Sequence, residues 1–158
     1  MARAPYNVLV LPYKMEKSTV QYCIFKREDM SVWQFIAGGG EDDELPLIAA
    51  QRETLEEAGI RSDELLSLTS MCHVAANLFS EKSQKNWGDK VIVIPVYSFA
   101  VLCDVNMKIS ISDEHLEYQW SYYDEAIKLL HFDLDKTALY ELNERINRNN
   151  VGRNQKQD

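Results

Sequence analysis

Three glutamates, Glu53, Glu56 and Glu57, fall within two turns of a predicted helix. Residues three and four apart lie side by side on a helix, so these carboxylates share one face and repel one another. A solvated acidic face is the ordinary explanation for such a pattern. Converging carboxylate oxygens are also the ligands that Mg²⁺ and Mn²⁺ prefer, and a bound cation would remove the repulsion.

The neighbours of these glutamates favour the metal hypothesis over the solvated face. Arg52 is adjacent and can pin one carboxylate, and the glycine run 38–40 lies just upstream, where a backbone can approach a ligand closely. The formal net charge is −8, so a cation would also bridge an acidic protein to an anionic substrate. The same charge argues against a nucleic-acid polymer held on a broad basic surface.

The helix that carries the glutamates has recognisable ends. Pro46 suits its first turn and Gly59 suits its end. At about 100° per residue, its apolar side chains gather nearly opposite the glutamates, with Gln51 interrupting the arc. These apolar residues are Leu47, Ile48, Leu55 and Ala58.

Apolar and β-branched runs elsewhere predict a sheet around this helix. Pro95 falls inside one run, and because it cannot donate to a ladder it implies a bulge or an edge position. Residues 80–90 are polar with one glycine, which indicates an exposed loop. The expected strands are Asn7–Tyr13, Val20–Lys26, Trp33–Ile36, Leu66–Phe79, Val91–Cys103 and Tyr118–Ser121.

Two helices are expected near the C-terminus, at Tyr123–Leu130 and Asp135–Arg148, and the second has an apolar stripe that should pack on the sheet. The order of strands and helices predicts a layered sandwich of the α/β or α+β class. We expect one domain over residues 1–148, followed by a polar, frayed tail over 149–158.

Together these residues resemble the Nudix box, a pattern of glycine, glutamate, arginine and a bulky aliphatic residue at fixed spacing; Thr54 departs at one aliphatic position. The resemblance extends over about residues 5–147, and implies an α/β/α sandwich with a mixed β-sheet. The implied activity is hydrolysis of a nucleoside diphosphate linked to another group. The matching residues are Gly38, Glu44, Arg52, Glu53, Glu56, Glu57, Gly59 and Ile60.

The resemblance also implies roles for single residues. Glu53, Glu56 and Glu57 would bind Mg²⁺, for which Mn²⁺ can substitute, and Glu53 would also be catalytic. Arg52 would orient Glu53, and Glu44 would support the loop and the helix start. Gly38 and Gly39 would form the loop that brings a backbone carbonyl to the metal and contacts substrate.

Two stretches outside the box resemble bacterial dihydroneopterin triphosphate pyrophosphatases. They are VWQFIAGG, in which Ile36 and Ala37 depart from the common lead-in, and SDEHLEYQW before the last strand. By that resemblance Glu114 would be a further metal ligand and catalytic group. Arg3, Lys26 and Ala37 would contact substrate, although both basic residues equally suit a solvated surface.

The implied function is a Mg²⁺-dependent pyrophosphohydrolase, with dihydroneopterin triphosphate as the preferred substrate. A (d)NTP or a dinucleoside polyphosphate stays open as the alternative substrate. A non-catalytic Nudix-fold binding module is disfavoured because every carboxylate of the box is present. The aromatic rings of Trp33, Phe79, Trp87 and Tyr118 suit either a core position or stacking on a pterin or purine.

The remaining features of the sequence indicate in which compartment the protein is found and which partners it has. Cys23, Cys72 and Cys103 lie in apolar stretches without metal spacing, which favours free thiols in a reducing compartment. No run approaches the roughly 20 apolar residues that cross a bilayer, so we expect a cytoplasmic protein that acts on a small phosphorylated molecule and not at a membrane. The sequence leaves a homodimer open.

Overall fold

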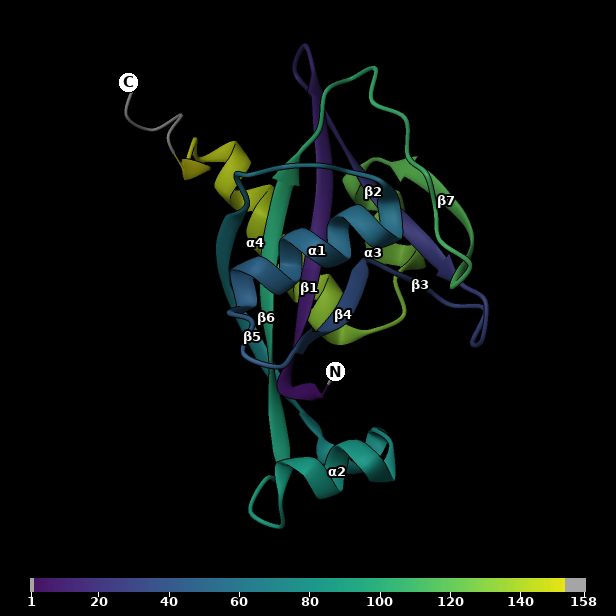
Figure 1. Ribbon diagram of the computed structural model, residues 1–158. Coiled ribbons are helices and arrows are strands. Elements are labelled where there is room, and N and C mark those ends of the chain that lie inside the picture. The colour runs from purple at the N-terminus through teal and green to yellow at the C-terminus, as the bar shows by residue number, and fades with distance from the viewer. Residues whose placement is uncertain (1, 153–158) are drawn as a thin grey trace.

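A computed structural model describes residues 2–152 and has the α/β/α architecture that the sequence predicts (Figure 1). A mixed sheet separates α1 on one face from α3 and α4 on the other, while α2 stands apart at one end. The strands are β1 (Arg3–Glu16), β2 (Thr19–Arg27), β3 (Trp33–Gln34), β4 (Ile36–Glu41), β5 (Leu66–Ala75), β6 (Val93–Leu102) and β7 (His115–Ser121). The helices are α1 (Pro46–Ala58), the 3₁₀ turn η1 (Ala76–Leu78), α2 (Glu81–Trp87), α3 (Tyr123–Leu129) and α4 (Asp133–Asn147).

Strand β1 organises the sheet because it pairs with three others. It runs parallel to β6 and antiparallel to both β4 and β2, which take successive stretches of its length. The main strand order is β3-β2-β1-β6-β5, with β7 paired to β2 and β4 paired to β1. Strands β2 and β4 therefore diverge beside α1, and this divergence positions the site described below.

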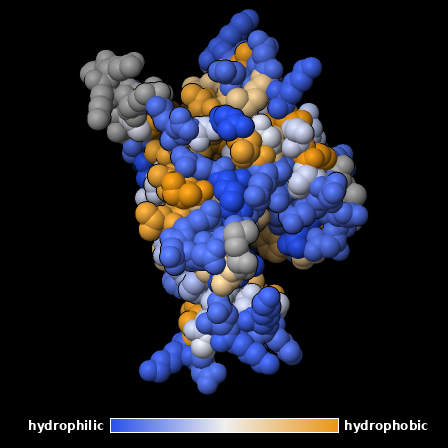
Figure 2. Space-filling view, viewed as in Figure 1, coloured by the Kyte–Doolittle hydropathy of each residue, from blue (hydrophilic) through white to orange (hydrophobic). Residues whose placement is uncertain are grey.

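Helix α1 packs through its small side chains, and this orientation differs from the simple expectation that its largest apolar side chains face the core. Ala49, Ala50 and Ala58 are fully buried, whereas Leu47 and Ile48 are 41% and 48% exposed. Small residues let the helix approach β4 closely, so the face that carries Glu53 and Glu57 turns inward. In Figure 2 an apolar patch marks the surface beside α1.

Two hydrophobic clusters fill the space on either side of the sheet. One lies under α1 and includes Val8, Val10 and Phe25; the other lies under α3 and α4 and includes Leu11, Ile24 and Leu139. The prediction that the last long helix packs its apolar stripe on the sheet is therefore confirmed. Its observed bounds are shifted by one or two residues from those expected.

The prediction of a loop over residues 80–90 is wrong, because α2 occupies most of it. Ser80 caps the helix, since its Oγ accepts from Ser83 N at 3.1 Å, and Glu81 and Lys85 suit the dipole at opposite ends. Gly88 ends it with φ of 96°. The strand expected over Leu66–Phe79 also ends early, at Ala75, and η1 begins at the next residue, Ala76.

Other strand predictions hold with changed bounds. The stretch Trp33–Ile36 divides into β3 and the start of β4, because β3 pairs with β2 while β4 pairs with β1. The last strand starts at His115 rather than Tyr118. Pro95 has a partner in β5 alone, since the pairing of β6 with β1 begins at Val96, which confirms its predicted edge position.

The predicted tail begins at Asn149, but the chain is still packed there: Val151 contacts the cluster beneath α4. The rest of the predicted tail, residues 153–158, lies outside the described residues. No helix within residues 2–152 is long and apolar enough to span a membrane.

Candidate active site

Arg52 ties the glycine strand to the acidic face of α1. Its Nε and Nη2 each lie 2.9 Å from one carboxylate oxygen of Glu44, in a two-pronged contact. Its Nη1 donates to Glu53 at 2.8 Å and to Glu56 at 3.2 Å, and Nη2 donates to the Gly39 carbonyl at 2.8 Å. One planar guanidinium thus fixes β4 and three glutamates in a single arrangement.

Glu44 braces the loop between β4 and α1, as the resemblance implied. Its Oε1 accepts from the Glu41 backbone N at 2.9 Å, and its own carbonyl accepts from the Tyr6 hydroxyl at 2.7 Å. The hydrogen bonds from Arg52 hold the pKa of Glu44 below its usual range. The Glu44 carboxylate is therefore ionised at neutral pH, where it holds Arg52 and the loop together.

Glu53 is one of two buried carboxylates on α1: it is 8% exposed, and Glu57 is 5% exposed. Burial raises the pKa of Glu53 to about 7, against the lowering effect of Arg52. Gly38 lies directly against it, since a Cβ on that glycine would come within 2.2 Å of Glu53 Cδ. The glycine thus makes room for this side chain, which gives the first glycine of the motif a physical reason.

Glu57 belongs to a second group of side chains at the far end of α1. Its Oε2 accepts from Ser112 Oγ at 2.8 Å and lies 2.9 Å from His115 Nε2. Burial raises its pKa, but His115, Glu114 and Ser112 together bring it below the usual range. The hydrogen bond to Glu57 in turn raises the pKa of Glu114, as expected when two carboxyl groups share a site.

Within residues 2–152, no three His, Cys, Asp or Glu side chains converge closely enough to hold a metal ion. Arg52 draws Glu53 and Glu56 toward β4, while Ser112 and His115 draw Glu57 the other way. The donor set nevertheless fits a divalent cation: it consists of hard carboxylate oxygens, and the buried Glu53 stands in a space that a Cβ at position 38 would fill.

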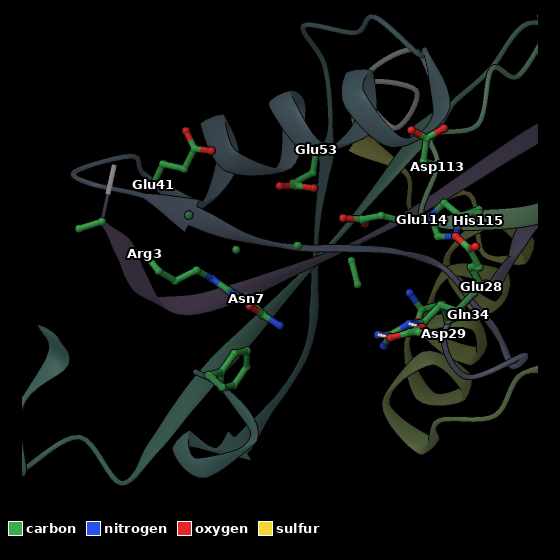
Figure 3. Close-up of a pocket in the computed structure, with 17 residues that line it drawn as sticks. Arg3, Asn7, Glu28, Asp29, Gln34, Glu41, Glu53, Asp113, Glu114 and His115 are labelled. Carbon is green, nitrogen blue, oxygen red and sulfur yellow. Dashed lines mark hydrogen bonds and ion pairs between the residues drawn. The ribbon is translucent and has the colours of Figure 1, made fainter. Parts of the chain in front are cut away.

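A cavity of about 1090 Å³ opens beside these carboxylates (Figure 3). In this view Arg3 and Asn7 lie on one side of Glu53, whereas Glu114, His115 and Gln34 lie on the other. The predicted site residues Arg3, Ala37, Gly38, Gly39, Glu53 and Glu114 all line the cavity.

Lys26 does not line this cavity. It pairs across β2 and β3 with Trp33, which packs on the cluster beneath α3 and α4, whereas its neighbour Phe25 packs on the cluster beneath α1. The alternation of side chains along a strand therefore turns Lys26 to the other face. Its Nζ lies 3.8 Å from Glu117 Oε1, and its substrate contact stays a prediction.

Several residues in the site were not assigned from the sequence. Ser112 holds Glu57 from a loop 55 residues downstream, and Asn7 and Gln34 line the cavity. Gln34, which follows Trp33 in the chain, is only 6% exposed, and its side-chain amide makes no hydrogen bond to another described residue. Polar residues inside otherwise apolar strands were the available signal for Asn7 and Gln34.

The α/β/α sandwich with an arginine-bound acidic helix beside a cavity defines the class of the protein as a phosphoanhydride hydrolase of the NUDIX type. The NUDIX domain matches residues 5–142, so the chain belongs to the Nudix family. Members of this family act on small phosphorylated substrates and generally use divalent metals such as Mg²⁺.

Three known proteins illustrate the range of relatives. The asymmetrical bis(5'-nucleosyl)-tetraphosphatase of Rattus norvegicus is 29% identical over 129 residues, covering 81% of this chain and 82% of that protein. A NUDIX hydrolase candidate from Listeria monocytogenes has a TM-score of 0.83 at 38% identity, covering 94% and 98% of the two chains. The E. coli dihydroneopterin triphosphate pyrophosphohydrolase has a TM-score of 0.71 at 21% identity, covering 90% and 99%, a likeness of fold.

Proposed function

We propose that this protein is a Mg²⁺-dependent hydrolase of dinucleoside polyphosphates. The observation that carries the proposal is the group of carboxylates on α1 that Arg52 holds, of which Glu53 lines a cavity of about 1090 Å³. This volume lies slightly above the roughly 300–1000 Å³ usual for small-ligand sites, which favours an extended substrate. The rat tetraphosphatase supports the same substrate class.

In the proposed mechanism Glu53, Glu56, Glu57 and Glu114 would hold the metal. When bound, the metal neutralises the phosphate oxygens and lowers the pKa of water. Arg52 keeps Glu53 and Glu56 oriented, and Glu44 keeps Arg52 in place; these contacts cost no reorganisation during the reaction.

The chain's other residues bind the substrate and limit its movement. Arg3 places a cationic guanidinium at one side of the cavity, where it suits a phosphate oxygen. The backbone at Gly38 and Gly39 borders the same space, and the lack of side chains there makes room for Glu53 and for the Arg3 guanidinium. Ala37, next to them, also lines the cavity.

Dihydroneopterin triphosphate is the second candidate substrate, favoured by the residues VWQFIAGG and SDEHLEYQW. The structure adds one supporting observation: Glu114, from the second stretch, lines the cavity and interacts with Glu57. Both substrates present a phosphoanhydride chain to the same site, but they differ in the number of phosphates and in the groups at the ends of the chain. We place the enzyme in the cytoplasm, where either substrate class would be met.

A substrate panel with saturating Mg²⁺ tests the proposal. We expect the highest kcat/KM on P1,P4-di(adenosine-5') tetraphosphate, with AMP and ATP as products separated by ion-exchange chromatography. Pyrophosphate release from dihydroneopterin triphosphate with a higher kcat/KM would select the second candidate. Absence of turnover on all of these and on the (d)NTPs, with folded protein, would overturn the proposed function.

Glu114→Gln tests whether the loop before β7 takes part. The change keeps size and removes charge, so we expect kcat to fall by on the order of 10²-fold, as for one positioned acid–base group. Glu125→Gln is the matched control, because Glu125 is an exposed residue of α3 that does not line the cavity. Equal kcat for wild type and Glu114→Gln would show that Glu114 takes no part in catalysis. The proposed role of the helix carboxylates would be unaffected.

A further inference from the structure

Helix α2 has no buried residue and a surface that is almost wholly polar, as Figure 2 shows at the lower end of the molecule. It is seven residues long, and a helix of this length is not stable alone in water. Contacts outside the helix must therefore hold it. The largest side chain available for this is Trp87, which is half-buried and does not line the cavity.

The contacts of Trp87 lead to Arg3. Its indole Nε1 donates to the Arg3 backbone carbonyl at 2.6 Å. Its ring meets the Phe79 ring edge to face, with centroids 5.6 Å apart. The Arg3 guanidinium lies over Phe79, 4.8 Å from the ring centroid. Trp87 thus holds the main chain of Arg3 directly and its side chain through Phe79.

The guanidinium held in this way has unused capacity to bind. Its Nη2 donates to Asn7 Oδ1, but its Nε is buried and makes no hydrogen bond to another described residue. Gly39 admits it, because a Cβ there would come within 1.9 Å of Nε. Arg3 as a whole is only partly buried and lines the cavity, so the accessible side of its guanidinium can meet a ligand oxygen there.

We propose that Trp87 is a positioning residue for substrate binding, which fixes Arg3 against Phe79 so that its guanidinium meets the phosphate chain already ordered. Arginine side chains lose considerable rotamer freedom on binding, and prior ordering removes that cost from the binding step. This inference rests on the proposed function, because it gives the ordered guanidinium a phosphate substrate. In this proposal α2 supports the cavity through its contact with Arg3.

Trp87→Phe tests the proposal, because phenylalanine keeps the ring against Phe79 and removes the indole donor. We expect KM for the best substrate of the panel to rise about fivefold, the effect of one neutral hydrogen bond, while kcat changes less than twofold. Lys82→Ala, at an exposed position of the same helix, is the matched control and should leave both constants unchanged. An unchanged KM in Trp87→Phe would overturn the proposal.

A double-mutant cycle separates positioning of Arg3 from a general structural role. In an Arg3→Ala background the guanidinium is absent, so Trp87→Phe should raise KM no further. A fivefold increase that persists in that background would show that Trp87 acts elsewhere and would overturn the proposal. A fall in Tm with unchanged KM for Trp87→Phe would assign Trp87 to fold stability alone.

Hydrogen exchange of the Arg3 Nε–H, followed by NMR in the free protein without substrate, keeps the test independent of turnover. We expect Trp87→Phe to accelerate this exchange at least severalfold and Lys82→Ala to leave it unchanged. Equal exchange rates in wild type and Trp87→Phe would overturn the proposal. If no substrate is turned over, the proposed function fails, yet the exchange rates still decide whether Trp87 orders Arg3.

Discussion

Two arginine–glutamate networks on opposite sides of the sheet differ in how fully their carboxylates are satisfied. On α4, Glu141 accepts from Thr69 N and Ser70 N at 2.6 Å each, and from Arg145 Nε at 2.8 Å. Although burial opposes it, the Ser70 hydroxyl, which also donates to this carboxylate, and these three donors together lower the pKa of Glu141 to about 2. On α1, by contrast, burial raises the pKa of Glu53 to about 7 although Arg52 contacts it.

The difference indicates which network stabilises the fold and which serves a ligand. Glu141 has a donor for each oxygen and joins α4 to the edge strand β5, which covers backbone donors that another strand could otherwise pair with. In the α1 network a single Arg52 faces Glu44, Glu53 and Glu56. Surplus negative charge at a cavity wall costs stability, and a bound cation would offset it.

The largest effect is expected from Glu53→Gln, which removes one charge from the undersatisfied network. We expect kcat to fall by about 10²–10⁴-fold, because the substitution removes a proposed ligand and positioned carboxylate. The Tm should hold or rise, since a buried charge is relieved. Steady-state kinetics and thermal unfolding check both, and an unchanged kcat would contradict the distinction between the two networks.

Arg52→Lys is expected to have a smaller effect on the same network. Lysine keeps the charge but cannot contact Glu44, Glu53 and Gly39 in one plane. We therefore expect kcat to fall by roughly 10–100-fold, with a change in Tm of only a few degrees. A collapsed Tm with normal kcat in the folded fraction would instead make Arg52 a purely structural residue.

Glu141→Gln should have the smallest effect on activity and a measurable effect on stability. We expect the free energy of unfolding to fall by about 2 kcal/mol at pH 7, the scale of charge-assisted hydrogen bonds, with kcat unchanged. Because the folded pKa is depressed, this contribution is present above about pH 4.5 and is lost as pH falls toward about 2.

Urea unfolding of wild type and Glu141→Gln at pH 7 and pH 3 measures that window. The difference in the free energy of unfolding between the two proteins should be smaller at pH 3 than at pH 7. Glu144→Gln is the matched control, since Glu144 pairs with the exposed Arg148 and should cost about 0.5 kcal/mol or less. A difference in the free energy of unfolding between wild type and Glu141→Gln that becomes larger at pH 3 would contradict the predicted pH dependence.

The sequence predicted which residues come together in the proposed site better than it predicted the elements around them. Fixed spacing on one helix is enough to bring Glu53, Glu56 and Glu57 to one side, because helical geometry is local. The rotation of α1 was not predictable from its apolar residues, since the packing partner is a glycine strand that accepts alanines and a glutamate. Gly38 contacts Glu53 only once β4 and α1 are assembled.

Long-range partners escaped prediction for a related reason. Ser112 and His115 meet Glu57 through chain folding, and nothing in their local sequence specifies that contact. Helix α2 was a different kind of error: Ser80, Glu81 and Gly88 are ordinary helix start and stop signals, but the polar composition suggested a loop. The indole contact of Trp87 with Arg3 then required tertiary structure.

The most direct test of the central claim, that the α1 carboxylates serve a divalent metal, is a calorimetric titration of the chelator-treated protein with Mg²⁺, followed by an assay of the same sample. We expect wild type to bind Mg²⁺, to be inactive in excess EDTA and to recover when Mg²⁺ or Mn²⁺ is added back. Glu53→Gln should bind Mg²⁺ at least tenfold more weakly, with Glu144→Gln as the control. Full activity in excess EDTA without carried-over metal, or equal Mg²⁺ affinity in wild type and Glu53→Gln, would contradict the account.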